Sequence, residues 1–237
     1  RCADVPALQI FLAEGDSPDV LSDNPDWRNQ RTPLHQLCMY SSNSMHGSNS
    51  ESDRVACFKL LREAGANLEA RVGRHPQGST VVHYAADSGS PEILSLLIEA
   101  GVNVNVANDG GYTPLHWAAR GDFGSSTDCL ELLLKAGAAV NVRASEVLSS
   151  TSGGGTPFDV ALKNGNPRMW ALFLRAGAEI PVPRPHPYLS RVHHAGGFKR
   201  YEQAHLARIT AILAPTPLLP PELVRKILEF WLHEGFY

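Results

Sequence analysis

Histidines are the residues of this 237-residue chain best suited to chemistry at neutral pH, either as general acids and bases or as metal ligands. The chain has ten histidines, of which His193 and His194 are adjacent and His186 lies shortly before them. These three could attract a metal ion. Adjacent histidines in a proline-rich segment are usually incidental, however, and no His-Glu-x-x-His motif for zinc is present. We therefore expect no metal and no cofactor.

Signatures of catalysis are also missing. The glycine-rich stretch SGGGTP (152–157) lacks the preceding strand and the lysine of a phosphate-binding loop. No Gly-x-Ser-x-Gly motif places a nucleophile, and the acidic residues are scattered without a convergent pair. We predict that the protein is not an enzyme.

Cysteine usage indicates structural thiols. The four cysteines Cys2, Cys38, Cys57 and Cys129 lie far apart and form no Cys-x-x-Cys pair. This spacing favours neither a zinc site nor a disulfide framework. We expect buried or partly buried free thiols, which persist in a reducing compartment.

Composition limits the partners. With 43% hydrophobic residues, 19% charged residues and a net charge of −3, the chain can bury a core. Its faintly acidic balance argues against nucleic acid, and no apolar run is long enough to insert directly into a membrane. We expect an intracellular, cytoplasmic protein. Import into an organelle stays open, because the sequence begins at Arg1 and its N-terminus looks incomplete.

A repeated pattern positions three of the histidines. RTPLHQLC starts at Arg31, STVVHYAA at Ser79, YTPLHWAA at Tyr112 and GTPFDVAL at Gly155. In each block a threonine precedes a stretch that fits the first turn of a helix, where threonine caps the end and proline is tolerated. Paired alanines then allow a neighbouring helix to approach closely. The blocks therefore predict short helices led by a capping threonine.

A second marker follows each block. REAGANLE, IEAGVNVN, LKAGAAVN and LRAGAEIP each end a second predicted helix on a glycine, which suits a left-handed C-terminus. Threonine and glycine are 21 residues apart in two copies, and the longer copies carry loop-like insertions. The Ser-rich insertion at 41–52 favours disorder over function. VNVNVANDGG (102–111) is typical of a hairpin with a tight turn at Asp109-Gly110.

These blocks resemble the ankyrin repeat, whose pattern is a hairpin, Thr-Pro-Leu-His-x-Ala-Ala, a helix pair and a glycine. The resemblance covers roughly residues 4 to 180, as four repeats and a partial N-terminal one. Val81-Val82 replace Pro-Leu, and Asp159 replaces the histidine. It implies an all-α, mainly helical solenoid with short β-hairpins, in which His35, His83 and His116 tie helices to hairpins. Each unit would bury its apolar side against its neighbours.

Solenoids of this type look like binding scaffolds, with partners on the concave face and the hairpin tips. In each first helix, the residue after the histidine and the residue three positions later lie on the same side, and these two positions indicate the concave face. Tyr84 and Trp117 stand out there, because packing at that position is not expected to require a large aromatic side chain. For Trp117, the alternative to a binding role is local packing against the neighbouring hairpin. The expected partner-binding residues are Gln36, Tyr84, Asp87, Trp117, Arg120, Arg71, Arg74, Asp109 and Tyr112.

The repeat pattern stops after residue 180. Four prolines in 181–197 predict an extended, stiff linker, and two helices are expected in the extension at 198–237. We expect this extension either to cap the last repeat or to dock a second protein, using Phe230, Trp231, Phe236 and Tyr237. It distantly resembles a suppressor-of-cytokine-signalling box: HLAR (205–208) and then LPPELVRKIL (219–228), with Ala207 where that box usually has cysteine.

The sequence thus predicts three parts: an ankyrin-repeat domain (1–180), a linker (181–197) and a C-terminal extension (198–237). The expected function is a non-catalytic protein–protein interaction module, as a scaffold or peripheral subunit of a larger assembly with one or more protein partners. The alternative is a substrate-recruiting adaptor of a ubiquitin ligase.

Overall fold

The computed structural model describes residues 4–21, 31–39, 50–74, 77–120, 127–145, 155–182 and 186–213, together with 220, 222, 223 and 226. The chain divides into two compact units, Arg1–Val160 and Ala161–Tyr237. Both are helical, as the sequence predicts. The division proposed above, with boundaries at 180 and 197, stays a prediction.

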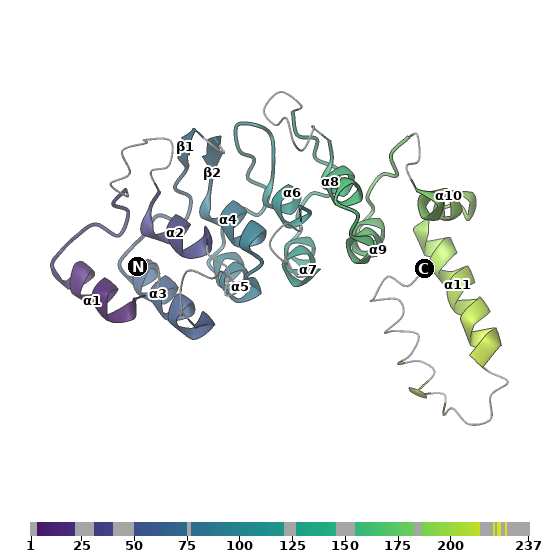
Figure 1. Ribbon diagram of the computed structural model, residues 1–237, viewed down its shortest axis with the longest axis horizontal. Helices are drawn as coiled ribbons and strands as arrows, with labels where there is room; N and C mark the ends of the chain where they lie inside the picture. The colour runs from purple at the N-terminus through teal and green to yellow at the C-terminus, as the bar shows by residue number, and fades with distance from the viewer. Residues whose placement is uncertain are drawn as a thin grey trace. The chain divides into compact units, whose positions relative to one another are not determined.

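Unit 1 is built from helices in two layers. Its elements are α1 (Val5–Ala13), α2 (Pro33–Met39), α3 (Glu51–Glu63), β1 (Val72–Arg74), β2 (Gln77–Ser79), α4 (Val81–Ser88), α5 (Pro91–Glu99), α6 (Pro114–Ala118) and α7 (Thr127–Lys135), followed by the start of α8 (Pro157–Lys163). The first helices α2, α4 and α6 lie side by side, and the second helices α1, α3, α5 and α7 form the other layer (Figure 1). The repeats formed by α2 and α3, by α4 and α5, and by α6 and α7 therefore each contribute one helix to each layer.

The layers bury one continuous apolar core. Fully buried leucines, isoleucine and phenylalanine from both layers fill the space between them, among them Phe58, Ile93, Leu115 and Leu130. The paired alanines are buried as well: Ala85 and Ala86 in α4 are 0% exposed. Small side chains at these positions let adjacent helices approach closely, as the sequence pattern indicates.

Second helices end at glycines with positive φ. Gly65, Gly101 and Gly137 have φ of 81°, 83° and 84°, in the left-handed region that L residues with side chains rarely adopt. A Cβ added there would meet nothing within 4 Å. The glycines are therefore required by backbone conformation and not by a close contact, in agreement with the prediction.

In the described residues, the connections between the repeats consist mostly of turns and contain little strand pairing. β1 and β2 pair antiparallel, with Val72 opposite Ser79, and Ala144 bridges to Gly155. At 102–111 the predicted hairpin is wrong in part, because that segment forms turns and no strand. Its tight turn is present, since the Gly111 N–H donates to the Asn108 carbonyl at 2.8 Å. Asn108 explains the difference: its side-chain oxygen accepts two backbone N–H groups, from Gly110 and Tyr112, and so takes the place of strand pairing.

Unit 2 contains α9 (Pro167–Arg175), α10 (Pro187–His194) and α11 (Phe198–Leu213). Helix α11 packs on both α9 and α10. The guanidinium of Arg175 donates from Nε and Nη2 to Oε1 of Glu202, at 3.0 and 2.7 Å. The rings of Tyr188 and Tyr201 meet edge to face, 5.6 Å apart. The first tail helix is thus present and packs on the second helix of the last repeat.

Helix α10 corrects the expectation of an extended linker at 181–197. His186 caps this helix, and Pro187 occupies its first turn, where a proline loses no useful hydrogen bond. Tyr188, Leu189 and Val192 are buried. Prolines therefore start this helix instead of preventing it. Most of the second predicted tail helix lies outside the described residues, as do Phe230, Trp231, Phe236 and Tyr237.

Candidate functional site

Histidines join the repeats of unit 1. In α4, the backbone N–H of Thr80 donates to Nδ1 of His83 at 3.1 Å, and Nε2 of His83 lies 2.9 Å from the carbonyl oxygen of Tyr112. Because Nδ1 accepts a hydrogen bond, the proton of the neutral ring is on Nε2, which donates to Tyr112. The ring therefore caps its own helix and ties it to the next connection.

The same joint recurs one repeat later. The Thr113 N–H donates to Nδ1 of His116 at 3.0 Å, and Nε2 of His116 lies 3.1 Å from the carbonyl oxygen of Gly155. At His35 the cap is present, with Thr32 Oγ1 at 2.7 Å from Nδ1. Nε2 of His35 makes no hydrogen bond of the same geometry among the described residues, although the backbone groups of Ala70 and Ser79 lie near the ring and raise its pKa. The ties of His83 and His116 are therefore better formed than that of His35.

Asp159 shows why the last copy departs from the pattern. Its carboxylate accepts from the Thr156 backbone N–H at 2.8 Å and from the Thr156 hydroxyl at 2.9 Å. These are the bonds that Nδ1 makes in the other copies. A carboxylate has no proton to donate to the following connection. Asp159 therefore caps its helix but cannot replace the hydrogen bond that Nε2 donates at His83 and His116.

Burial keeps these histidines neutral. It lowers the pKa of His35, His83 and His116 from 6.5 to about 4, with the backbone carbonyls only partly opposing the effect. The role predicted for them, as structural ties, is what the contacts of His83 and His116 describe.

The aromatic side chains nominated for binding are packed instead of open. Tyr84 and Trp117 are each 5% exposed, and their rings meet edge to face at 5.4 Å. His35 meets Tyr84, and His83 meets Trp117, both at 5.5 Å. Packing does require these rings, contrary to our expectation: each fills the space beside the histidine of the preceding first helix. The signal in the sequence was the pair of alanines that follows each ring, because small side chains let the helices come close enough for such contacts.

Two arginines cover the outer side of these rings. The guanidinium carbon of Arg31 lies 5.7 Å from the ring centre of Tyr84, and that of Arg120 lies 6.0 Å from the ring centre of Trp117. Arg31, Gln36, Asp87 and Arg120 are partly exposed. The predicted face therefore has buried aromatic rings beneath a polar layer that carries two arginines, one aspartate and one glutamine. Sequence reasoning missed Arg31, which precedes the motif by one residue.

The residues predicted at the hairpin tips make separate contacts and form no single cluster among the described residues. Nη1 of Arg71 donates to the carbonyl oxygens of Gly78 and Ala107, both at 3.2 Å, and so holds two neighbouring connections together. Asp109 is exposed, and the Tyr112 ring packs on His116 at 5.4 Å. The side chain of Arg74 lies outside the described part. Whether any of these residues binds a partner stays a prediction.

The remaining candidates for chemistry lie in conventional surroundings. In the part of the chain that the structure describes, no three His, Cys, Asp or Glu side chains gather to hold a metal ion. Cys38, Cys57 and Cys129 are buried free thiols, and burial raises the pKa of Cys38 and Cys129 to about 12. Within the same residues, no helix has the length and apolar character to cross a membrane.

Comparison with known proteins identifies the repeats. Residues 45–144 match the family of ankyrin repeats, in three copies. The chain therefore contains ankyrin repeats in this region, and the resemblance seen in the sequence is confirmed over residues 45–144.

Relatives with different overall roles share this region. The human "Ankyrin repeat and SOCS box protein 16" is 36% identical over 109 residues, which are 46% of this chain and 21% of that protein. The Arabidopsis thaliana "Putative E3 ubiquitin-protein ligase XBAT31" is 30% identical over 164 residues, 63% of this chain and 29% of that protein. Mouse "Protein phosphatase 1 regulatory subunit 12A" is 39% identical over 79 residues, 32% and 7% of the two chains. The chain thus spans less than a third of each.

Proposed function

We propose, from the ankyrin repeats in this chain, that it is a non-catalytic recognition subunit that holds another protein on the face formed by α2, α4 and α6. Ankyrin repeats serve protein–protein interaction, and the joints between them are closed by buried histidines that leave this face available. The observation that carries the proposal is the pair of arginines stacked on the buried rings, Arg31 on Tyr84 and Arg120 on Trp117.

Stacking makes these arginines suitable for recognition. A guanidinium that is held over an aromatic ring loses little further freedom on binding. Arginine and aromatic residues also carry much of the energy of protein interfaces. The matching partner segment presents carboxylates to Arg31 and Arg120, and a basic group suits Asp87 between them.

Affinity purification with two matched variants tests this function. Arg120→Glu reverses the charge on the proposed face, whereas Arg62→Glu makes the same change at an exposed position of α3, in the other layer. We expect Arg120→Glu to reduce recovery of the specific partners at least tenfold, and Arg62→Glu to leave it unchanged. Equal recovery with both variants, at equal unfolding temperature, would place the interface elsewhere.

A second function is supported by the extension after the repeats. HLAR (205–208) on α11, followed by LPPELVRKIL (219–228), has the two-part layout of a suppressor-of-cytokine-signalling box. The name of one relative combines such a box with ankyrin repeats, and another relative is named as a ubiquitin ligase. In this role the repeats would hold the substrate, and the extension would bind the ligase.

Capture of elongin-type adaptor proteins tests the second function. The full chain is expected to retain them, and Ala207→Cys, which restores the usual residue of the box, is expected to strengthen the retention. Gln203→Cys on the same helix is the matched control. No retention by either the parent chain or Ala207→Cys would reject the adaptor function and leave the recognition subunit standing.

A further inference from the structure

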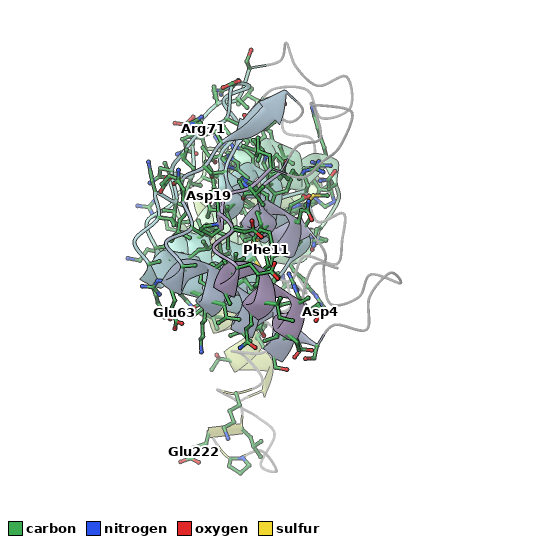
Figure 2. All side chains as sticks on the ribbon, turned by 90° about the vertical axis from the view of Figure 1, so that its left-hand side faces the viewer. Asp4, Phe11, Asp19, Glu63, Arg71 and Glu222 are labelled. Carbon is green, nitrogen blue, oxygen red and sulfur yellow. The ribbon has the colours of Figure 1, made fainter. Side chains whose placement is uncertain are left out.

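A ladder of hydrogen bonds connects the turns that follow the second helices. In each rung, a side-chain oxygen accepts a backbone N–H of the next repeat: Asp19 from Asn67 at 3.0 Å, Glu69 from Asn103 at 3.0 Å, and Asn105 from Ala139 at 2.7 Å. Figure 2 looks onto the N-terminal end of unit 1, where Asp19 is labelled between Arg71 and Phe11. The rung from Asp19 to Asn67 therefore joins the turn after α1 to the turn after α3.

A second side chain, two residues earlier, shapes each of the first three turns. The side-chain oxygen of Asn67 accepts the backbone N–H of Glu69 at 3.0 Å, and Asn103 makes the same bond one repeat later. Ser17 occupies this place in the first turn, where its Oγ accepts the N–H of Asp19 at 3.3 Å. Asparagine and serine both form turns of this kind, but only serine carries a hydroxyl that can be phosphorylated.

Ser17 is followed by Pro18, and Ser-Pro is the step that proline-directed protein kinases read. Four other Ser-Pro or Thr-Pro steps lie in the described part of the chain, and their hydroxyls are buried and hydrogen-bonded at the N-termini of helices: Thr32, Ser90, Thr113 and Thr156. Ser17, in contrast, is exposed. A following proline also holds a residue in extended backbone, the conformation in which kinases bind their substrates. Of these five hydroxyls, only that of Ser17 is therefore accessible to a kinase.

Acidic side chains flank Ser17 in the sequence. Glu14, Asp16 and Asp19 lie within three residues of it, and residues 12–21 contain no lysine or arginine. A phosphoserine carries about −1.5 to −2 charges at neutral pH, and next to carboxylates it disrupts structure by repulsion. Oγ of Ser17 lies 3.3 Å from the backbone nitrogen of Asp19, so a phosphate on Oγ would stand beside the carboxylate that holds Asn67.

We propose that Ser17 is a phosphorylation site for a proline-directed protein kinase, and that its phosphate breaks the hydrogen bond from Asn67 to Asp19. The kinase transfers the γ-phosphoryl group of ATP. A bond forms between Ser17 Oγ and the γ-phosphorus, the bond from that phosphorus to the bridging oxygen breaks to release ADP, and the hydroxyl proton passes to the catalytic base of the kinase. The modification loosens the turn after α1 and leaves the rungs at Asn103 and Ala139 intact.

Treatment of the full chain with a purified proline-directed kinase and MgATP tests the site. Mass spectrometry is expected to show that Ser17 is phosphorylated at least tenfold faster than Ser90, which has the same Ser-Pro sequence but is 3% exposed. Ser17→Ala should remove that phosphate, and the peptide LAEGDSPDVL (12–21) is the positive control for the kinase. Equal rates at Ser17 and Ser90, or no reaction at Ser17 when the peptide reacts, would overturn the proposal.

Amide hydrogen exchange of the phosphorylated full chain, followed by NMR, tests the effect on the rung. The Asn67 amide is expected to exchange at least fivefold faster than in the unmodified chain, because its acceptor is displaced. The amides of Asn103 and Ala139 make the same kind of bond in later turns and should keep their rates. An unchanged rate at Asn67, or an equal increase at all three amides, would contradict the proposal.

Asp19→Asn is the matched control for the charge. Asn105 shows that an amide oxygen accepts the same bond at this position of the repeat. The phosphorylated Asp19→Asn chain is therefore expected to keep its protection at Asn67, because the carboxylate that the phosphate repels is absent. Equal acceleration in the parent chain and in Asp19→Asn would show that the phosphate does not act through this carboxylate, and would reject the proposal. Neither measurement involves a partner protein, so both are independent of the proposed function.

Discussion

The interior joints of unit 1 and its N-terminal end are built from the same pattern but are completed to different degrees. At the interior joints, His83 and His116 use both ring nitrogens, and the helices on either side are buried. At the N-terminal end, Nε2 of His35 makes no hydrogen bond of that geometry among the described residues, and α1 has no buried residue. The helices of the interior are therefore held by contacts on both sides, whereas α1 packs on α3 alone among the described helices.

Acid is expected to produce the largest effect, because it acts on all the joints together. The pKa of His35, His83 and His116 is lowered by burial to about 4, whereas the unfolded chain titrates near 6.5. The unfolded state therefore binds more protons below pH 6.5, so stability is full above that pH and is lost as the pH falls toward 4. At pH 5 the loss is roughly 2 kcal/mol for each histidine.

Urea unfolding at pH 7 and pH 5 measures this loss. The expected result is a fall in the free energy of unfolding of several kcal/mol, which is a large part of the stability of an ordinary domain. His193 and His194 are exposed and lie outside the joints, so their double replacement by glutamine is the control. A free energy that stays constant over this range would contradict the neutral, buried state of the three rings.

Removing one joint at a time is expected to produce the next largest effect. His116→Ala and His35→Ala each remove a fully buried ring and a cap, but only at His116 does Nε2 also make a well-formed hydrogen bond to a neighbouring connection, the one to the Gly155 carbonyl. We expect His116→Ala to lower the free energy of unfolding by about 1 kcal/mol more than His35→Ala, the usual worth of one hydrogen bond. Equal losses would mean that the tie to Gly155 contributes nothing.

Polar side chains in the turns between repeats offer the smallest test. Asn105 accepts from the Ala139 N–H at 2.7 Å and donates to the Gly137 carbonyl at 3.2 Å, whereas near the N-terminal end Asp19 only accepts, from the Asn67 N–H. We expect Asn105→Ala to cost about 1 kcal/mol and Asp19→Ala about 0.5 kcal/mol. Thermal unfolding of both variants measures the difference, and a larger loss for Asp19→Ala would reverse the ranking of the two regions.

The sequence predicts most of the stack because its rules are local. Threonine before a short helix, histidine three residues later and glycine after the second helix each satisfy a backbone requirement within a few residues. The ties from His83 and His116 follow from the repeat itself. Helix α10 was missed because four prolines suggest extended chain, although Pro187 at the first turn is compatible with a helix.

The candidate site was less predictable because it depends on neighbours. Tyr84 and Trp117 occupy variable positions, and only the three-dimensional packing shows that their rings cover the preceding histidines. Arg31 lies outside the motif and reaches the site through its stacking on Tyr84.

Native-state hydrogen exchange of the full chain tests the difference between interior and end most directly. If each helix depends on its neighbours, the amides of α4, α5 and α6 should show the highest opening free energies, those of α2 and α3 intermediate values, and those of α1 the lowest. Protection of α1 equal to that of α4 would show that the N-terminal end needs no neighbour, and would contradict the account.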